Sequence, residues 1–461
     1  MKKTNFRYTI QLLIVLLGVL PLTTMAQDRE FYLRPSYWRP YDQRGINVFE
    51  TSKQADSIPF AGPRIRFGAG FTQQFQNLKQ ENKDAANNKA TNRLYPIQSG
   101  FMTAQANLNT DVQLADGIRL NVTTYLSSRH HNEAWVKGGY IQFDKLPFKG
   151  EFWNKLMDVA TIKVGHMEIN YGDQHYRRSD GGQTLYNPFM DNYIVDAFTT
   201  EIGGEVYLQK NGLFGMLGLT NGMIKGHIDS TYVTKASDGA VIDDNTKRAP
   251  AIYLKGGIDK SLAEKLRVRV SGSFYHNGSS AGSGNTLYWG DRTGSNYQNV
   301  MEKVGLNGIT PGTSLPSSTS IPWSGRINPG FSKRVDALML NGFLKAGGLE
   351  LFGTVEKASG RTKTEKENRQ MTQLAGDVVY RFGKAENLFV GSRLNTVKAE
   401  LAGITNDVTV NRFALAGGWF VTKNVLMKAE YVVQKYKDFP AADYRAGGKF
   451  KGYVVEAVVG F

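Results

Sequence analysis

The chain has 461 residues, a formal net charge of +15 and no cysteine. This length fits two or three soluble domains or one large barrel. The absence of cysteine excludes disulfides and thiolate metal sites, and charged residues at 21% exclude a bundle of transmembrane helices. The 50 glycines and an aromatic content of 11% favour many strands with tight turns and aromatic residues near the strand ends.

The N-terminus has the pattern of a secretory signal. Basic residues at Lys2, Lys3 and Arg7 precede the apolar run 10–20, and small residues at 24–26 offer a cleavage site. The apolar run is too short to cross a bilayer comfortably as a helix. We therefore expect residues 1–26 to be a signal peptide, which lowers the net charge by three when it is removed. A retained anchor helix is the alternative.

Residues 27–63 are irregular and aromatic. Four prolines, at Pro35, Pro40, Pro59 and Pro63, argue against a strand or a helix, because proline lacks a backbone N–H donor and restricts the backbone. We expect a periplasmic lead-in before the first strand, with the interior of the following domain as its alternative location.

From Arg64 onward the chain shows repeated period-two alternation, which predicts strands with two different faces. In residues 265–275, Leu266, Val268 and Val270 face one way, and Lys265, Arg267 and Arg269 face the other. Most of the segments have ten or more residues, the length that a tilted transmembrane strand needs. We predict sixteen strands: 64–76, 97–111, 117–128, 134–145, 159–168, 200–209, 213–221, 250–259, 265–275, 335–345, 348–357, 371–383, 387–397, 408–420, 424–436 and 450–461.

The connections between these strands alternate in length. Short ones, such as 115–116, 210–212 and 346–347, contain the Gly, Asn or Asp residues of tight turns. Long ones, such as 169–199 and 276–334, are rich in Gly, Ser and Asn. Short turns at one end and long loops at the other are typical of a transmembrane barrel. Two connections depart from this alternation. Residues 129–133 are short where a long loop is expected. Residues 146–158 are long where a short turn is expected, and they contain a predicted short helix over 151–157.

The strands can cross lipid only as a closed barrel, because every backbone polar group must be paired within the protein. We therefore predict an all-β, transmembrane, antiparallel up-and-down barrel over residues 64–461. A barrel of sixteen strands leaves an aqueous interior, unlike one of eight. The inward-facing side chains of the alternating strands include basic residues that we expect to line a pore: Arg119, Lys163, Lys265, Arg267, Arg269 and Arg412.

This layout resembles a Gram-negative outer-membrane porin, and most closely the phosphate-selective porin (O and P type) family. In porins the third external loop folds inward. That position here is 169–199, so the resemblance implies a pore constriction at His175, Arg177 and Arg178. It also implies a homotrimer, and a terminal aromatic residue, Phe461, that the barrel assembly machinery reads. The family's pore-lining ladder of lysines is absent here, so phosphate specificity does not follow.

Other interpretations of the same residues stay open. Lumenal arginines can pair with carboxylates and only brace the wall. The pair His130-His131 suggests a metal, but adjacent side chains on a strand point apart, which favours a loop tip. No H-E-x-x-H or P-loop motif is present. We therefore expect no enzyme, no cofactor, no metal site and no nucleic-acid partner.

Two functions remain from the sequence. The first is a channel in the outer membrane for passive diffusion of small polar solutes, with a preference for anions because of the lumenal arginines. The second is a non-conducting barrel that acts as a scaffold or partner subunit of an envelope secretion or uptake complex. In both cases the expected surroundings are outer-membrane lipid and lipopolysaccharide.

Overall fold

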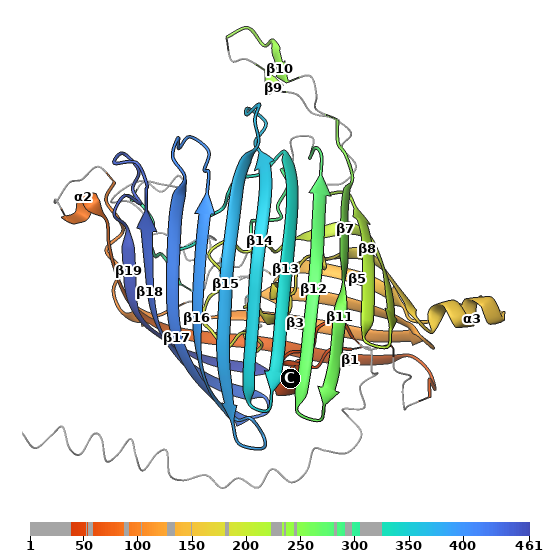
Figure 1. Ribbon diagram of the computed structural model, residues 1–461. Coiled ribbons are helices and arrows are strands. Elements are labelled where there is room, and N and C mark those ends of the chain that lie inside the picture. Colours follow the sequence, from red (N-terminus) through yellow and green to blue (C-terminus); the bar gives the residue numbers. More distant parts are fainter. Residues whose placement is uncertain are drawn as a thin grey trace, which may run out of the picture.

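The computed structural model describes residues 38–51, 53, 59–86, 92–102, 104–126, 134–148, 150–179, 184–222, 233–234, 237–243, 247–280, 284–290, 297–304 and 325–461. The predicted signal peptide and the pair His130-His131 lie outside these residues. The described chain forms one closed antiparallel barrel (Figure 1).

The wall of the barrel is sixteen strands around when β2 and β3 are counted as one interrupted strand. Its first half consists of β1 Arg64–Glu81, β2 Gly100–Phe101, β3 Gln105–Ala115, β4 Ile118–Leu126, β5 Ala134–Phe143, β6 Ala160–Glu168, β7 Thr200–Lys210 and β8 Leu213–Thr220. Its second half consists of β11 Ala251–Ala263, β12 Leu266–Asn277, β13 Arg334–Ala346, β14 Leu349–Arg361, β15 Arg369–Phe382, β16 Leu388–Ala399, β17 Val408–Thr422, β18 Val425–Lys437 and β19 Lys449–Gly460. The two-residue β2 pairs with β1 just beyond the end of β3, so β2 and β3 share one position.

The barrel closes through β1, which has 18 residues. Its first half, from Arg64 to Thr72, pairs with β3, and its second half, from Gly70 to Glu81, pairs with β19. The terminal residue takes part, because Ala69 donates to the Phe461 carbonyl at 2.8 Å and Phe461 donates back at 3.1 Å. All sixteen predicted strands are confirmed, and several, including β1 and β11, are longer than predicted.

The two ends of the barrel differ as expected. At the turn end, β3–β4, β7–β8 and β11–β12 are joined by two residues each. The predicted helix over 151–157 is confirmed as α3 Glu151–Met157, which projects outward from the barrel at this end (Figure 1). At the loop end, the small hairpin of β9 Val233–Thr234 and β10 Val241–Asp243 stands above the wall. The remaining short helices are η1 Gln43–Gly45, α2 Lys83–Ala86 and η2 Gln174–Arg177. In the described part of the chain, no helix is long and apolar enough to cross a membrane.

The outer face of the wall is apolar. Along β16, Leu388, Val390 and Leu394 are exposed on the outside, and Arg393 and Asn395, which flank Leu394, are buried inside. The same alternation recurs on the other strands of the wall, including β8 and β17. Each strand is hydrogen-bonded to a neighbour on both sides around the whole ring, as a wall that faces hydrocarbon requires.

We expect the outward position of Leu394 to be intolerant of charge. Leu394 is in the middle of β16 and 63% exposed, and Leu388 at the turn end of the same strand is 51% exposed. Leu394→Arg should lower the free energy of unfolding in lipid vesicles by about 2–4 kcal/mol, and Leu388→Arg by about 1 kcal/mol or less. Urea unfolding of the two variants measures the difference. Equal losses of unfolding free energy in the two variants would show that Leu394 does not lie deeper in the bilayer than Leu388.

Candidate functional site

The interior of the barrel is occupied by the chain itself. The N-terminal segment (residues 38–50) enters it, and so does the lumenal insert between β6 and β7 (residues 169–179 and 184–199). Every described residue of the lumenal insert is buried except His175 and Tyr176, which are half-buried. Parts of the segment between β12 and β13, including Tyr288 and Tyr297, are buried beside them. The third external connection therefore lies inside the barrel.

Basic side chains on one side of the wall hold the lumenal insert. From β17, Arg412 contacts the Asp191 carboxylate at 3.1 Å, and from β18, Lys428 donates to the carbonyls of Thr184, Asn187 and Phe189 at 3.0–3.2 Å. Two backbone N–H groups of the insert are also hydrogen-bonded to the wall. The Ile194 N–H donates to Asn395 of β16 at 2.7 Å, and the Val195 N–H donates to Gln373 of β15 at 3.0 Å. Buried backbone and charge are thus paired along this wall.

A second cluster joins the N-terminal segment, the lumenal insert and the wall. Lys255 of β11 lies 3.0 Å from Glu50 and 2.7 Å from Asp173, and Arg269 of β12 lies 2.7 Å from Glu50 and 2.8 Å from Asp173. Ser271 also donates to Asp173 at 2.7 Å. Two cations and two carboxylates from three parts of the chain therefore neutralise one another in the interior.

The cluster shifts the titration of both carboxylates. Burial alone would raise the pKa of Glu50, but the charges of Lys255 and Arg269 outweigh burial and lower that pKa from 4.5 to about 2. Burial opposes a low pKa at Asp173 too, and the same two cations hold its pKa well below the usual range. Both groups are therefore ionised at neutral pH, as the ion pairs require.

The three residues predicted for a constriction are placed as follows. Arg177 is 2% exposed, contacts Asn47 and lies 3.4 Å from the Glu350 carboxylate of β14. Arg178 is 5% exposed and its Nε donates to Asp196 at 3.2 Å. Both guanidinium groups thus have carboxylate partners: the Arg177 pair joins the lumenal insert to β14, and the Arg178 pair lies within the insert.

His175 is the most accessible of the three. Its ring nitrogens lie 2.8 Å from Glu168 and 2.9 Å from Asn170, so one links the insert to the end of β6 and the other braces the insert. Together with Arg178 it faces the cavity described below.

The predicted pore-lining residues differ in their location and in their ion-pair partners. Arg267 and Arg269 face inward, but both pair with Asp259 on the neighbouring β11, at 2.7 and 3.2 Å. Arg119 pairs with Asp144 at 3.2 Å. The parity of Lys265 is inward, yet it lies exposed in the turn between β11 and β12 and does not line the lumen, because the strands end before it. Lys163 on β6 faces the cavity.

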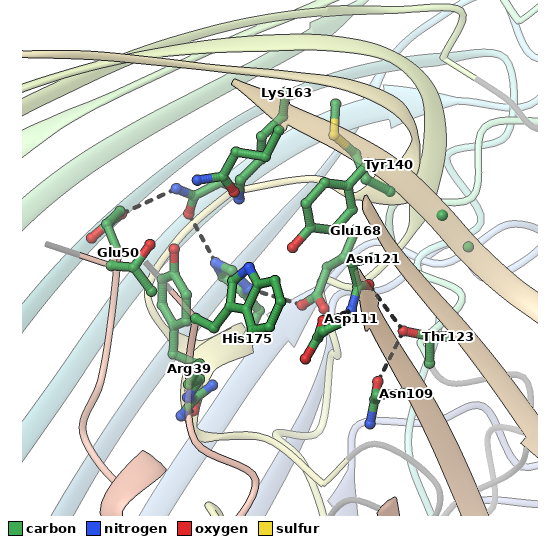
Figure 2. A pocket seen from close by; sticks show the side chains of 18 of the residues that line it. Arg39, Glu50, Asn109, Asp111, Asn121, Thr123, Tyr140, Lys163, Glu168 and His175 are labelled. Atoms are coloured by element: carbon green, nitrogen blue, oxygen red, sulfur yellow. Dashed lines mark hydrogen bonds and ion pairs between the residues drawn. The ribbon is translucent and has the colours of Figure 1, made fainter. Parts of the chain in front are cut away.

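A cavity of about 290 Å³ lies between the N-terminal segment, the lumenal insert and the wall formed by β3 to β7 (Figure 2). In Figure 2, Arg39 and Glu50 lie on one side, and Asn109, Asp111, Asn121 and Thr123 lie on the other. Hydrogen bonds order this wall: Asn121 donates to Asp111 at 2.7 Å and Thr123 to Asn109 at 3.0 Å. The lining consists chiefly of amides, hydroxyls, aromatic rings and a few charges.

The sequence indicated part of this lining. The polar parity of β3 and β4, with Asn107, Asn109, Asp111 and Asn121, points inward as alternation predicted. Trp38 and Tyr41 of the N-terminal segment were missed as lining residues, because the irregular segment has no periodicity that places its side chains. Among the described residues, no group of three or more His, Asp or Glu side chains is arranged to hold a metal ion.

No protein-family model matches the chain, and no curated protein matches it. Solved structures of outer-membrane proteins resemble it. The anion-selective porin from Comamonas acidovorans has 10% identity and a TM-score of 0.47, over 87% of this chain and 100% of that one. The outer membrane channel DcaP of Acinetobacter baumannii has 10% identity and a TM-score of 0.47, over 87% and 98%. In-vitro folded OmpT, an outer membrane protein of Vibrio cholerae, has 11% identity and a TM-score of 0.47, over 88% and 100%.

With TM-scores under 0.5 and identities near one tenth, these likenesses establish neither a family nor an activity for this chain. They give no support to the phosphate-selective family in particular. The barrel fold is established instead by the strand pairing described above.

We expect the buried pair of Lys428 and Glu456, at 2.7 Å and with both side chains fully buried, to be essential for docking the insert. Lys428→Met should lower the free energy of unfolding by about 3–5 kcal/mol, because it leaves a buried carboxylate without its cation. The double variant Lys428→Met/Glu456→Leu should recover most of that loss. Urea unfolding in vesicles tests both, and equal stability of the single and double variants would contradict the prediction.

We also expect acid to loosen the N-terminal segment. Because the pKa of Glu50 is lower in the folded chain than its ordinary value of 4.5, its contribution to docking is complete above that value and disappears as the pH falls through about 2. A spin label at Arg44, whose side chain is 53% exposed, should become more mobile over this range. Glu50→Gln should show the mobile spectrum already at neutral pH. A label that stays immobile at pH 2 would reject this account.

Proposed function

We propose that the chain forms an outer-membrane channel for small polar solutes, and that the solute path is the cavity along β3 to β7. One observation supports this path most directly: strands β11 to β18 bind the insert, and the cavity lies beside the wall of β3 to β7. The path is narrow, since about 290 Å³ is at the lower limit of ordinary ligand pockets.

The height of the cavity fits a route through the barrel. Its lining includes Thr161 at the start of β6 and Glu168 at the end, near the turn end and the loop end respectively. Seven residue steps along a strand span about 23 Å, which a tilt of about 40° reduces to about 18 Å along the axis. An apolar band is about 25 Å tall, so the cavity covers most of the membrane thickness.

The charges of the cavity favour anions modestly. Lys163 lies over the rings of Tyr140 and Tyr207, at 5.2 and 4.9 Å, and has no carboxylate partner among the described residues. Arg39 donates to the carbonyls of Gly45 and Tyr176 and, within the described chain, has only a longer-range electrostatic interaction with the Glu168 carboxylate. Cations whose charge is not matched locally attract anions into a confined path.

The expected route to the membrane belongs to the same proposal. Residues 1–26 would direct export and be removed. The Phe461 ring is 48% exposed at the turn end, where the assembly machinery could read it. A homotrimer, with lipid and lipopolysaccharide around it, is the arrangement that the porin resemblance implies.

The second candidate is a non-conducting barrel that serves an envelope complex as a scaffold or partner subunit. The occupied lumen favours it, because the N-terminal segment and the lumenal insert are both bound by buried ion pairs. The two candidates differ in one measurable property, which is ion conductance.

Conductance recordings with single-cysteine variants distinguish the two candidate functions. The chain has no cysteine of its own, so each introduced cysteine is the one reactive thiol. Planar-bilayer recordings of the purified protein should show small stepwise currents with anion preference. Gln209→Cys near the turn end and Thr123→Cys on β4 both line the cavity, so a charged thiol reagent should reduce the current of each. Lys265→Cys, in the exposed turn, is the control and should react without losing current. Absence of any conductance would reject the channel in favour of the second candidate.

A further inference from the structure

The part of the cavity nearest the turn end combines two partly exposed polar side chains, Lys163 and Gln209, with aromatic rings. Lys163 on β6 lies over two tyrosine rings and forms no ion pair within the described residues. The Gln209 amide on β7 lines the cavity and has no hydrogen-bond partner in the described part of the chain. Tyr207 lies two residues before Gln209 on the same face of β7, and its ring is the one that Lys163 overlies. These groups therefore form one continuous patch.

The chemistry of this patch differs from that of a simple anion site. An inorganic anion accepts hydrogen bonds only, and donors alone would suffice for it. The patch offers the Gln209 amide, which both donates and accepts, whereas Gln142 and Thr161 beside it already donate to Asp144 at 2.9 and 3.1 Å. A solute hydroxyl also donates and accepts, so a lining of this kind is complementary to a polyhydroxylated solute.

The aromatic rings add a second requirement. Tyr140 and Tyr207 offer flat apolar surface at the cavity, which suits the C–H face of a sugar ring better than a small hydrated ion. Lys163 adds a positive charge beside those rings that no carboxylate of the described chain neutralises. A cation next to flat apolar surface and a bifunctional amide selects a sugar ring with an acidic group.

We propose that this patch is a binding subsite for a monosaccharide acid of the hexuronate type. The Lys163 ammonium pairs with the solute carboxylate, and the Gln209 amide exchanges hydrogen bonds with ring hydroxyls. The proposal rests on the channel function above and names its solute class. Its size agrees, because a cavity of about 290 Å³ admits a small ligand and no long chain.

Isothermal titration calorimetry on the full-length protein in detergent tests the subsite without any need for conductance. Glucuronate should bind more tightly than glucose, which lacks the carboxylate, and more tightly than acetate, which lacks the ring. Lys163→Gln should weaken glucuronate about ten- to a hundredfold, the usual effect of losing a charge-assisted hydrogen bond. Gln209→Leu should weaken glucuronate and glucose alike.

Lys265→Gln is the matched control, because it removes the same charge from the exposed turn and should leave glucuronate affinity unchanged. In bilayers, glucuronate should also interrupt the current of the unmodified protein more often than acetate does. Glucuronate that binds no better than acetate or glucose would overturn the subsite, and so would equal effects of Lys163→Gln and Lys265→Gln. Tight glucuronate binding without conductance would support the subsite and reject the channel, so the two proposals fail separately.

Discussion

The structure depends on the matching of charges inside the barrel. A wall sixteen strands around encloses a space that water would fill, but here three parts of the chain fill much of it. Lys255 and Arg269 neutralise Glu50 of the N-terminal segment and Asp173 of the lumenal insert. Ions buried away from water are tolerated only when they are paired and hydrogen-bonded. The basic wall residues therefore fix where the insert lies, and through it the shape of the remaining space.

This docking makes the interior asymmetric. Strands β15 to β18 bind the insert with basic and amide side chains, and strands β3 to β7 face the cavity with amides, hydroxyls and tyrosines. Distributed evenly around the barrel, the same basic, amide and hydroxyl side chains would line a wide pore uniformly. Basic side chains that pair hold the interior together, and Lys163, which forms no ion pair within the described residues, faces the cavity. The proposed solute path therefore follows one wall of the barrel.

Much of the fold could be predicted from the sequence, because side-chain alternation is local. Leu394 and Arg393 are adjacent, and only a strand with one apolar and one polar environment explains both. The roles of the lumenal arginines could not be predicted to the same extent. Arg267 and Arg269 have no acidic neighbour on their own strand, which suggested free charges. Their partner Asp259 lies on the adjacent strand, and the register that pairs it with Arg269 is set only when β11 and β12 form.

By itself, the sequence determined the number of strands, their inward and outward faces and the end at which the long connections lie. These features follow from period-two alternation and turn composition, which act over a few residues. Only the tertiary structure decided that the lumen is occupied, that Arg177 and Arg178 are paired, and that the open space lies beside β3 to β7. Those outcomes depend on contacts between residues such as Glu50, Asp173 and Lys255, which are far apart in the chain and meet only after the barrel closes.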